Sequence, residues 1–418
     1  MSTVLYHNDQ DGRCAASIAR TAYPELYPVV GSYDGNVHWE KFRYGDLVVV
    51  ADMRFNPTTM IRLANNYRLI HIDHHLPNEE ELAELQAAKY NPSGIRPTTK
   101  PIDKSASLLS WEYFFKDKPV PHAVKLIDDY DLWKFKYPDT LAFHYGLETV
   151  DHGPRNLDLW ERLFNDDPGA LDFIRMRGEE LLGFILPNNK ICCHDLCYET
   201  TLEDYTVLAV NTRAANSSLF DGYVDKSRHD FMLMYAYIGS IGLYRCSLYP
   251  AKSELNADKL AQIYGGGGHP GAAGFSCKDL PFTQREGTQP KVPLFSNVYA
   301  EMEDYLATSN VAKMYIRKSQ RLSIMSQYFI SQFEDQPCVV VNSPLTAVEL
   351  FFALDSVTCP VAISYVWTNI GQYRVIIHPL MRVANLEIFK EKYKGRMVDG
   401  SLWFYCDELP FQLCKRIK

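Results

Sequence analysis

Segment 71–75 reads His-Ile-Asp-His-His and follows the largely apolar residues 67–70. The apolar part is typical of a buried strand, and packing gives no reason for such a strand to end in an acid and two imidazoles. Side chains alternate along extended backbone, so Asp73 and His75 point to one side and His74 to the other. One imidazole can then bind a metal while the carboxylate orients it or the other imidazole meets a substrate. The alternative without chemistry is a cluster of hydrogen-bonded histidines at a strand end.

A second polar group follows the strand-like residues 3–6. It consists of His7, Asp9 and Asp11, with Gly12 permitting a tight turn into a helix. These side chains would stand at the carboxyl end of a strand, where ligand sites in parallel α/β sheets lie. An aspartate that caps the helix is the structural alternative, but one acid would suffice for that role.

Two further segments deliver carboxylates. The apolar residues 46–51 predict a strand that ends in Asp52. A helix predicted over 123–133 carries Asp128, Asp129 and Asp131 at its end, which a solvated helix end would also explain. Because the carboxyl ends of parallel strands meet at one edge of a sheet, these groups should converge.

Two imidazoles and four carboxylates are therefore expected at a common edge: His7, Asp9, Asp11, Asp52, His74 and one acid among Asp128, Asp129 and Asp131. This set suits a pair of divalent ions such as Mn²⁺, with Asp52 placed to bridge them. Two ions about 3.5–4 Å apart activate a water and stabilise an in-line displacement at phosphorus. The chemistry predicted from these residues is phosphoester hydrolysis.

The chain changes character after about residue 192. Strands are predicted over 206–211, 231–237 and 244–249, followed by a helix and the glycine-rich segment 265–275. So many glycines make sense where backbone amides must approach an anion. A flexible linker is the alternative, but a His-Pro pair and small apolar residues are embedded in the segment. Residues 283–292 have the composition of a true linker.

The composition is that of a globular chain of two or three domains, with 418 residues of which 46% are hydrophobic. The net charge of −8 disfavours tight binding to long duplexes, since that binding grows with the phosphates neutralised. No apolar run reaches the roughly 20 residues that a membrane helix needs, and the amino terminus starts on a strand-like stretch without a signal peptide. Ten scattered cysteines favour reduced thiols, so we expect a cytoplasmic protein with no membrane partner.

The motifs resemble those of the DHH/DHHA1 superfamily of phosphoesterases, over residues 1 to about 280. The similar positions are the His-x-Asp-x-Asp-Gly turn at 7–12, Asp52, the Asp-His-His of 73–75 and the Gly-Gly-Gly-His of 266–269. Within the superfamily, segments 6–16, 111–115 and 129–133 look like the nanoRNase B branch. That branch is associated with short oligoribonucleotides and cyclic nucleotides.

The resemblance implies two Mn²⁺ ions, with Mg²⁺ or Co²⁺ as alternatives, held by His7 and Asp9 on one, Asp11, His74 and Asp129 on the other, and Asp52 on both. It also implies that His75 contacts the scissile phosphate, that Asp73 supports the histidines, and that Gly266, Gly267, Gly268 and His269 hold substrate. This chain departs from the family at Tyr249, where an arginine is common. Arg245 on the same strand could compensate.

The expected fold is α/β throughout. It comprises a parallel-sheet catalytic domain over 1–156, a helical connector over 157–190, a substrate-binding domain over 191–282 and a C-terminal α/β domain over 295–418. The expected activity is Mn²⁺-dependent hydrolysis of short oligonucleotides to nucleoside monophosphates. Alternative enzymes are a phosphodiesterase for cyclic mono- or dinucleotides, a single-strand exonuclease and a nucleotide phosphatase. A nucleotide-binding sponge is the alternative without catalysis, although a sponge would not need every carboxylate.

The C-terminal domain resembles the domain before it. A shift of 129 positions gives 11 identities in the 39 residues 239–277, including Gly266 with Gly395 and Phe275 with Phe404. We therefore expect a second, degenerate copy of the substrate-binding domain. Val398 stands in place of His269, so this copy should lose the anion site and pack on the catalytic half or form a homodimer.

Overall fold

The computed structural model describes residues 1–31, 37, 39, 42–75, 77–94, 102–212, 217–239, 241–283, 308–315, 328–334, 336–343, 359, 361–368, 370–380, 386–398, 401–411 and 413. The chain divides into two compact units, Met1–Leu182 and Gly183–Lys418. One unit contains a parallel sheet and the other contains two mixed sheets, so the expected α/β fold class is confirmed. Most of the linker predicted over 283–292 lies outside the described residues.

The sheet of the first unit has five strands, all parallel, in the order β2-β1-β3-β4-β5. Their bounds are β1 Thr3–Tyr6, β2 Tyr27–Val30, β3 Leu47–Ala51, β4 Arg68–Ile72 and β5 Ser93–Gly94. The strands expected before His7, Asp52 and the histidine cluster are therefore present and adjacent. Their polar carboxyl ends lie at one edge, because neighbouring parallel strands end together.

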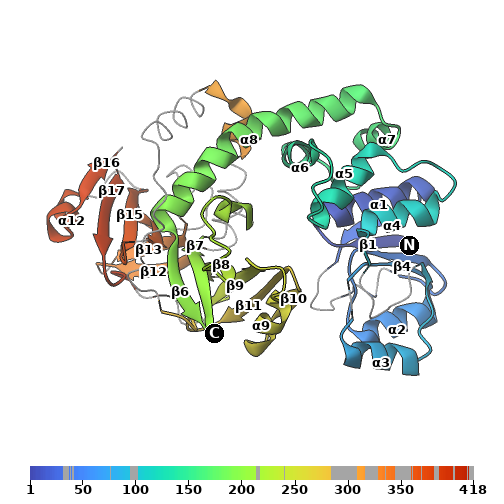
Figure 1. Cartoon of the computed structure of the whole chain (residues 1–418), viewed down its shortest axis with the longest axis horizontal. Coiled ribbons are helices and arrows are strands. Elements are labelled where there is room, and N and C mark those ends of the chain that lie inside the picture. Colours follow the sequence, from blue (N-terminus) through green and yellow to red (C-terminus); the bar gives the residue numbers. More distant parts are fainter. Residues whose placement is uncertain are drawn as a thin grey trace. The chain divides into compact units, whose positions relative to one another are not determined.

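Helices cover both faces of this sheet (Figure 1). On one side lie α1 Gln10–Ala22 and α4 Ala106–Phe114, and on the other lie α2 Pro57–Asn66 and α3 Glu79–Ala87. Alternate residues of β3 divide between the two cores: Val49 packs with the α1 side, and Val48 and Val50 pack with the α2 side. A sheet buried on both faces explains why these strands read as continuous apolar runs.

Further helices complete the first unit and lead out of it: α5 His122–Asp131, α6 Thr140–Glu148, α7 Leu157–Phe164 and α8 Pro168–Leu196. Helix α8 runs across the boundary between the units, whereas α7, which also falls in the connector expected over 157–190, packs in a core of the first unit. No helix in the described part of the chain combines the length and the apolar character needed to cross a membrane.

The first sheet of the second unit has the order β10-β11-β9-β8-β7-β6. Its strands are β6 Tyr198–Leu202, β7 Tyr205–Asn211, β8 Phe231–Ile238, β9 Leu243–Pro250, β10 Gly267–His269 and β11 Ala272–Cys277, and α9 Ala257–Ile263 follows β9. Only the β7–β8 pair among these is parallel. The three strands expected in this region are confirmed.

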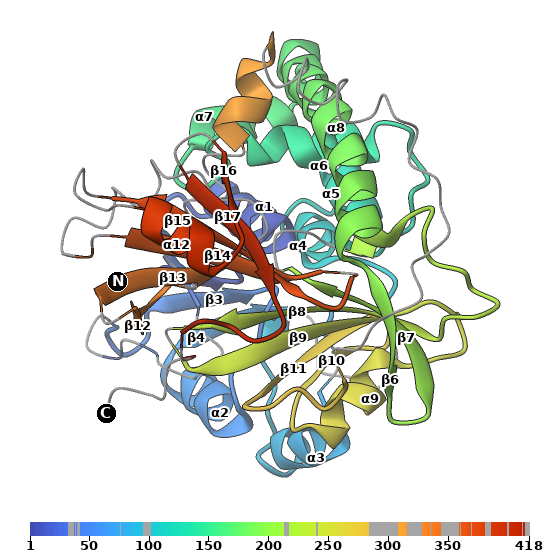
Figure 2. The same ribbon diagram turned by 90° about the vertical axis from the view of Figure 1, so that its left-hand side faces the viewer.

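The second sheet of this unit repeats the first (Figure 2). Its strands are β12 Phe329–Phe333, β13 Gln336–Asn342, β14 Val361–Trp367, β15 Tyr373–Pro379, β16 Arg396–Val398 and β17 Ser401–Cys406, with α12 Glu387–Lys392 after β15. The order β16-β17-β15-β14-β13-β12 matches the first sheet strand for strand, and β13–β14 is again the one parallel pair among these strands. The strand order and directions are those that a duplicated domain requires.

Small details repeat as well. A side chain at Gly266 would meet the carbonyl oxygen of Gly274 at 2.2 Å, and one at Gly395 would meet that of Trp403 at 2.8 Å. Each glycine therefore lets its segment lie close to the next strand. Tyr264 stacks on Phe275 with ring centroids 4.5 Å apart. The corresponding pair in the second sheet, Tyr393 and Phe404, stacks at 4.6 Å.

The two sheets meet through a reciprocal pair of buried asparagines. Nδ2 of Asn211 donates to Oδ1 of Asn342 at 3.1 Å, and Nδ2 of Asn342 donates to Oδ1 of Asn211 at 3.0 Å. Oδ1 of Asn342 also accepts from the Tyr237 amide at 3.0 Å, and Oδ1 of Asn211 accepts from the Trp367 amide at 2.9 Å. Each amide group is thus satisfied by equivalent partners from the two repeats, which fixes the register between the sheets.

We expect Asn342→Leu to leave the Tyr237 amide without its acceptor and to destabilise the second unit by about 2 kcal/mol or more, because buried polar groups lose their partners. Hydrogen exchange followed by mass spectrometry should show faster exchange at Tyr237. Asn211→Leu should do the same at Trp367, and the double variant should cost less than the sum of the two. Unchanged exchange at Tyr237 in the single variant would contradict the role given to this pair.

Candidate metal centre

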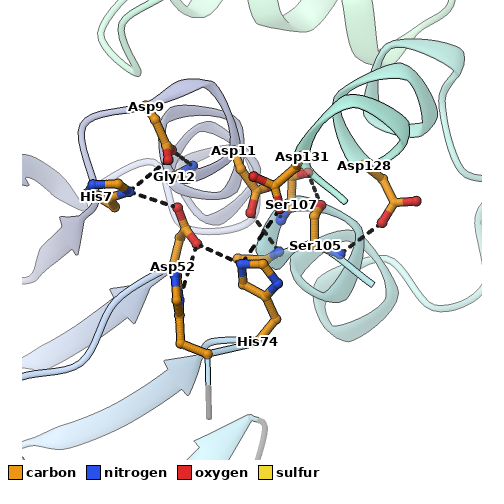
Figure 3. A network of polar contacts seen from close by, with 12 residues as sticks. His7, Asp9, Asp11, Gly12, Asp52, His74, Ser105, Ser107, Asp128 and Asp131 are labelled. Carbon is orange, nitrogen blue, oxygen red and sulfur yellow. Dashed lines mark hydrogen bonds and ion pairs between the residues drawn. The ribbon is translucent and has the colours of Figure 1, made fainter. Parts of the chain in front are cut away.

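Imidazoles and carboxylates from four elements gather at the carboxyl edge of the parallel sheet (Figure 3). Three groups, each with ligand atoms within 4.8 Å of one another, occur among the described residues: His7, Asp9 and Asp52; Asp52, His74 and His75; Asp11, His74 and Asp131. Asp52 and His74 each belong to two groups, so the three form one continuous centre. The convergence of His7, Asp9, Asp11, Asp52 and His74 is as expected from their positions after strands.

One end of the centre is built by the turn after β1. Nδ1 of His7 lies 2.7 Å from Oδ2 of Asp9 and 3.5 Å from Oδ2 of Asp52. The other oxygen of Asp9 accepts a hydrogen bond from the Gly12 amide at 2.9 Å and caps α1. Asp9 therefore has both of the roles that the sequence left as alternatives, cap and candidate ligand.

The other end of the centre contains His74 and Asp131. Nε2 of His74 lies 3.4 Å from Oδ1 of Asp52 and 3.6 Å from Oδ2 of Asp131. Asp131 is the last residue of α5, where a negative charge is unfavourable beside the exposed helix carbonyls. Burial, followed by the charge of Asp11, raises the pKa of Asp131 well above its usual value. Helix capping therefore does not explain why an aspartate stands at the carboxyl end of α5.

Asp52 lies at the middle of the centre and is almost completely buried. Its backbone has φ 57°, in the left-handed region that aspartate tolerates better than most residues. Neither of its carboxylate oxygens has a well-aligned hydrogen-bond donor among the described residues, although Nδ1 of His7 lies 3.5 Å from Oδ2. Burial, and then the charges of Asp11 and Asp9, raise its pKa well above the usual value. A buried carboxylate without donors is costly unless a cation neutralises it.

Asp11 is held by the amino terminus of α4. Its two oxygens accept hydrogen bonds from the amides of Ala106 at 2.7 Å and Ser107 at 2.9 Å. The helix terminus favours the anionic form, yet burial still raises the pKa of Asp11. Ser105 caps this helix, and the start of the helix thereby has a role in the centre.

His75 is oriented by Asp73. Nδ1 of His75 donates to Oδ1 of Asp73 at 2.6 Å, and the His75 amide donates to the same oxygen at 3.1 Å. Burial pushes the pKa of Asp73 upward, but the hydrogen bond and charge of His75 outweigh it, so the net pKa is lowered. An ionised Asp73 thus fixes the ring of His75. This supports the role expected for Asp73, while contact between His75 and a phosphate stays a prediction.

The expectation that Asp129 is a metal ligand requires correction. Its carboxylate accepts hydrogen bonds from the amides of Lys136 and Tyr137 at 2.9 and 3.2 Å, and from Oγ1 of Thr140 at 2.6 Å. These three donors occupy it away from the centre, and the place assigned to it is taken by Asp131. Among the three acids, the geometry therefore favours Asp131 over Asp129 as the ligand.

The glycine segment also differs from expectation. Gly267 to His269 form strand β10, and the amide of Gly268 donates to Oδ1 of Asp258 at 2.9 Å. The amide of Gly266 donates to the Ala261 carbonyl at 3.0 Å. These two amides are engaged within the protein, so the segment is not an open anion cradle in this conformation. The expected substrate contacts of Gly266, Gly267, Gly268 and His269 stay predictions, as does that of Arg245, whose side chain is exposed on β9.

Two residues near the centre were not among the predicted site residues. Arg54 lies 3.9 Å from Oδ2 of Asp73 and donates to Glu81 at 2.9 Å. His71 is buried, with Nε2 3.2 Å from the Met53 carbonyl and Nδ1 3.2 Å from the Tyr90 hydroxyl. The alternation of the strand places His71 away from His74, which is the available signal that its role is structural.

The residues present fit divalent cations. Three buried carboxylate oxygens, both of Asp52 and Oδ2 of Asp131, receive no hydrogen bond from the described residues and lie close to imidazole nitrogens. Mixed carboxylate and imidazole ligands suit Mn²⁺ and similar ions. His7, Asp9 and Asp52 would hold one ion, and Asp11, His74 and Asp131 would hold a second beside Asp52.

Asp131→Asn should lower Mn²⁺ content, because it removes a charge from the group with Asp11 and His74. Asp129→Asn should keep the metal and lower thermal stability, because its three hydrogen bonds are structural. Metal analysis and equilibrium dialysis of the two variants check this pair. Loss of metal from the Asp129 variant alone would restore the original assignment.

Metal affinity should rise steeply with pH. The contacts with Asp52 first and Asp9 second raise the pKa of His7 to about 10 in the metal-free protein, so the ring is protonated at neutral pH. A metal must displace that proton, and its affinity should grow by about tenfold per pH unit between about pH 6 and 9. Calorimetry in buffers of different ionisation heat should show proton release on Mn²⁺ binding. An affinity that does not change over this range would contradict the assignment of His7.

Comparison with known proteins gives weak likenesses. No family model matches the chain. An uncharacterised protein, R106, from Acanthamoeba polyphaga mimivirus is 24% identical over 243 residues, which is 55% of this chain, and the chain spans about half (52%) of the length of that relative. Two solved structures are each similar at 12% identity and a TM-score of 0.39. One is the pGpG-specific phosphodiesterase PggH from Vibrio cholerae, and the match covers 66% of this chain and 93% of PggH. The other is RecJ with Mn²⁺ from Thermus thermophilus, and the match covers 96% of this chain and 67% of RecJ. At these scores the likenesses do not by themselves assign a family or a substrate to the chain.

Proposed function

We propose that the protein is a metal-dependent phosphodiesterase that hydrolyses short oligonucleotides to nucleoside monophosphates, with Mn²⁺ as its ion. The observation that carries this proposal is the continuous centre in which Asp52 and His74 each belong to two groups of candidate ligands. A centre with shared ligands suits two ions rather than one. Bound there, such ions supply a nucleophile from water near neutral pH and neutralise charge on a phosphoryl group.

The residues of the chain have separate tasks in this proposal. Asp52 joins the two halves of the centre, since its two oxygens face His7 on one side and His74 on the other. Asp73 holds Nδ1 of His75, so the ring keeps one orientation. When protonated, His75 can present an N–H from Nε2 to a phosphate oxygen, where charge develops during displacement.

The proposal is tested by incubating the full chain and Mn²⁺ with labelled dinucleotides, cyclic nucleotides and longer single strands. Dinucleotides should be hydrolysed faster than long strands, because a chain of net charge −8 repels an extended polyanion. Asp52→Ala should lower turnover by a factor of about 10³ or more. The control is Asp158→Ala, which removes an exposed acid from α7 and should change nothing.

Two results would count against this function. A long strand hydrolysed as fast as a dinucleotide would favour an exonuclease, and exclusive cleavage of cyclic substrates would favour a cyclic nucleotide phosphodiesterase. Binding of nucleotides without hydrolysis under any metal condition would favour the sponge.

A further inference from the structure

Beside the metal centre, the loop after α5 exposes two large aromatic side chains. Trp133 is 46% exposed and Phe135 is 40% exposed, and neither ring belongs to a core cluster formed by the described residues. Their ring centroids lie 5.3 Å apart at an interplanar angle of 81°. Exposed aromatic rings gathered at one place contribute little to folding and suit a binding surface.

The backbone under these rings is unusual. Trp133 has φ 52° and Phe135 has φ 44°, both in the left-handed region that bulky residues avoid. The loop is held in this form by Asp129, whose carboxylate binds the amides of Lys136 and Tyr137, and by Lys134, which binds Asp128 at 2.8 Å. The acids that proved not to join the metal centre therefore position the aromatic loop.

The loop is connected directly to the centre. Asp131 precedes Trp133 by two residues, and the Tyr130 ring lies 6.0 Å from Trp133 and 6.1 Å from Phe135. On its other side Tyr130 stacks on His144 with centroids 3.5 Å apart. The carbonyl of His144 in turn accepts from Nε2 of Gln10, the residue between Asp9 and Asp11. This series of contacts links the two rings to the turn that carries Asp9 and Asp11.

We propose that Trp133 and Phe135 form a stacking platform for a nucleobase of the substrate. The proposal rests on the proposed function and adds to it a reason for preferring nucleotides over other phosphodiesters. Base–aromatic stacking is tolerant of sequence, because every base has a π face, and each stacked base contributes about 1–3 kcal/mol. The exposed ring of Trp133 provides the larger of the two surfaces.

The test compares binding of AMP with binding of ribose 5-phosphate, which lacks the base, to the full chain loaded with Mn²⁺. Calorimetry should show that Trp133→Ala weakens AMP binding by about tenfold and leaves ribose 5-phosphate unchanged. Trp133→Phe should keep most of the AMP affinity. Phe173→Ala is the matched control, since Phe173 is 51% exposed on α8 of the same unit.

Tryptophan fluorescence gives a second readout that does not depend on activity. AMP should quench the emission of the wild type, and Trp133→Phe should lose that quenching. If Trp133→Ala weakens the binding of AMP and of ribose 5-phosphate equally, or changes the binding of neither, the stacking platform is overturned. A wild type that hydrolyses dinucleotides but binds AMP no better than ribose 5-phosphate overturns the platform alone. If the wild type hydrolyses no dinucleotide and binds neither AMP nor ribose 5-phosphate, the proposed function is overturned as well.

Discussion

Repulsion among buried carboxylates is the interaction on which the centre depends. Asp11, Asp52 and Asp131 are near one another, and burial raises the pKa of each carboxyl group. The charge of Asp11 raises the pKa of Asp52 and Asp131 further. For Asp11 itself, the charge of His74 partly opposes the effect of burial. Such an arrangement is unfavourable for the fold alone, because ionised groups lose water and, of the three, only Asp11 gains amide donors in return. A divalent cation reverses the balance. The first unit supplies the rigid frame, with ligands at the ends of three adjacent strands and at the end of one helix.

Much of this could be predicted from sequence because strand ends are visible in it. His7, Asp52 and His74 each follow a short apolar run, and parallel strands bring such positions to one edge without further information. The repeat between the two sheets of the second unit was also visible, since Gly395 and Phe404 repeat Gly266 and Phe275 at a fixed distance along the chain. The observed strand order explains why those positions persist, as each glycine lies close to an adjacent strand.

The sequence could not settle what depends on rotation and three-dimensional pairing. Residues of a helix are turned by about 100° each, so Asp129 and Asp131 face opposite ways, and only packing decides which faces the sheet. In the same way, Gly268 could not be known to give its amide to Asp258. The reciprocal bond between Asn211 and Asn342 joins residues 131 positions apart. The sequence shows an asparagine at the end of β7 and another at the end of β13, but it does not show that the two side chains bind each other.

The most direct measurement of the central claim is anomalous diffraction from crystals grown with Mn²⁺, recorded at the manganese edge. We expect two peaks at the carboxyl edge of the parallel sheet, one contacted by His7 and Asp9, the other by Asp11, His74 and Asp131, with Asp52 touching both. A single peak, a peak at Asp129, or no peak at saturating Mn²⁺ would contradict it.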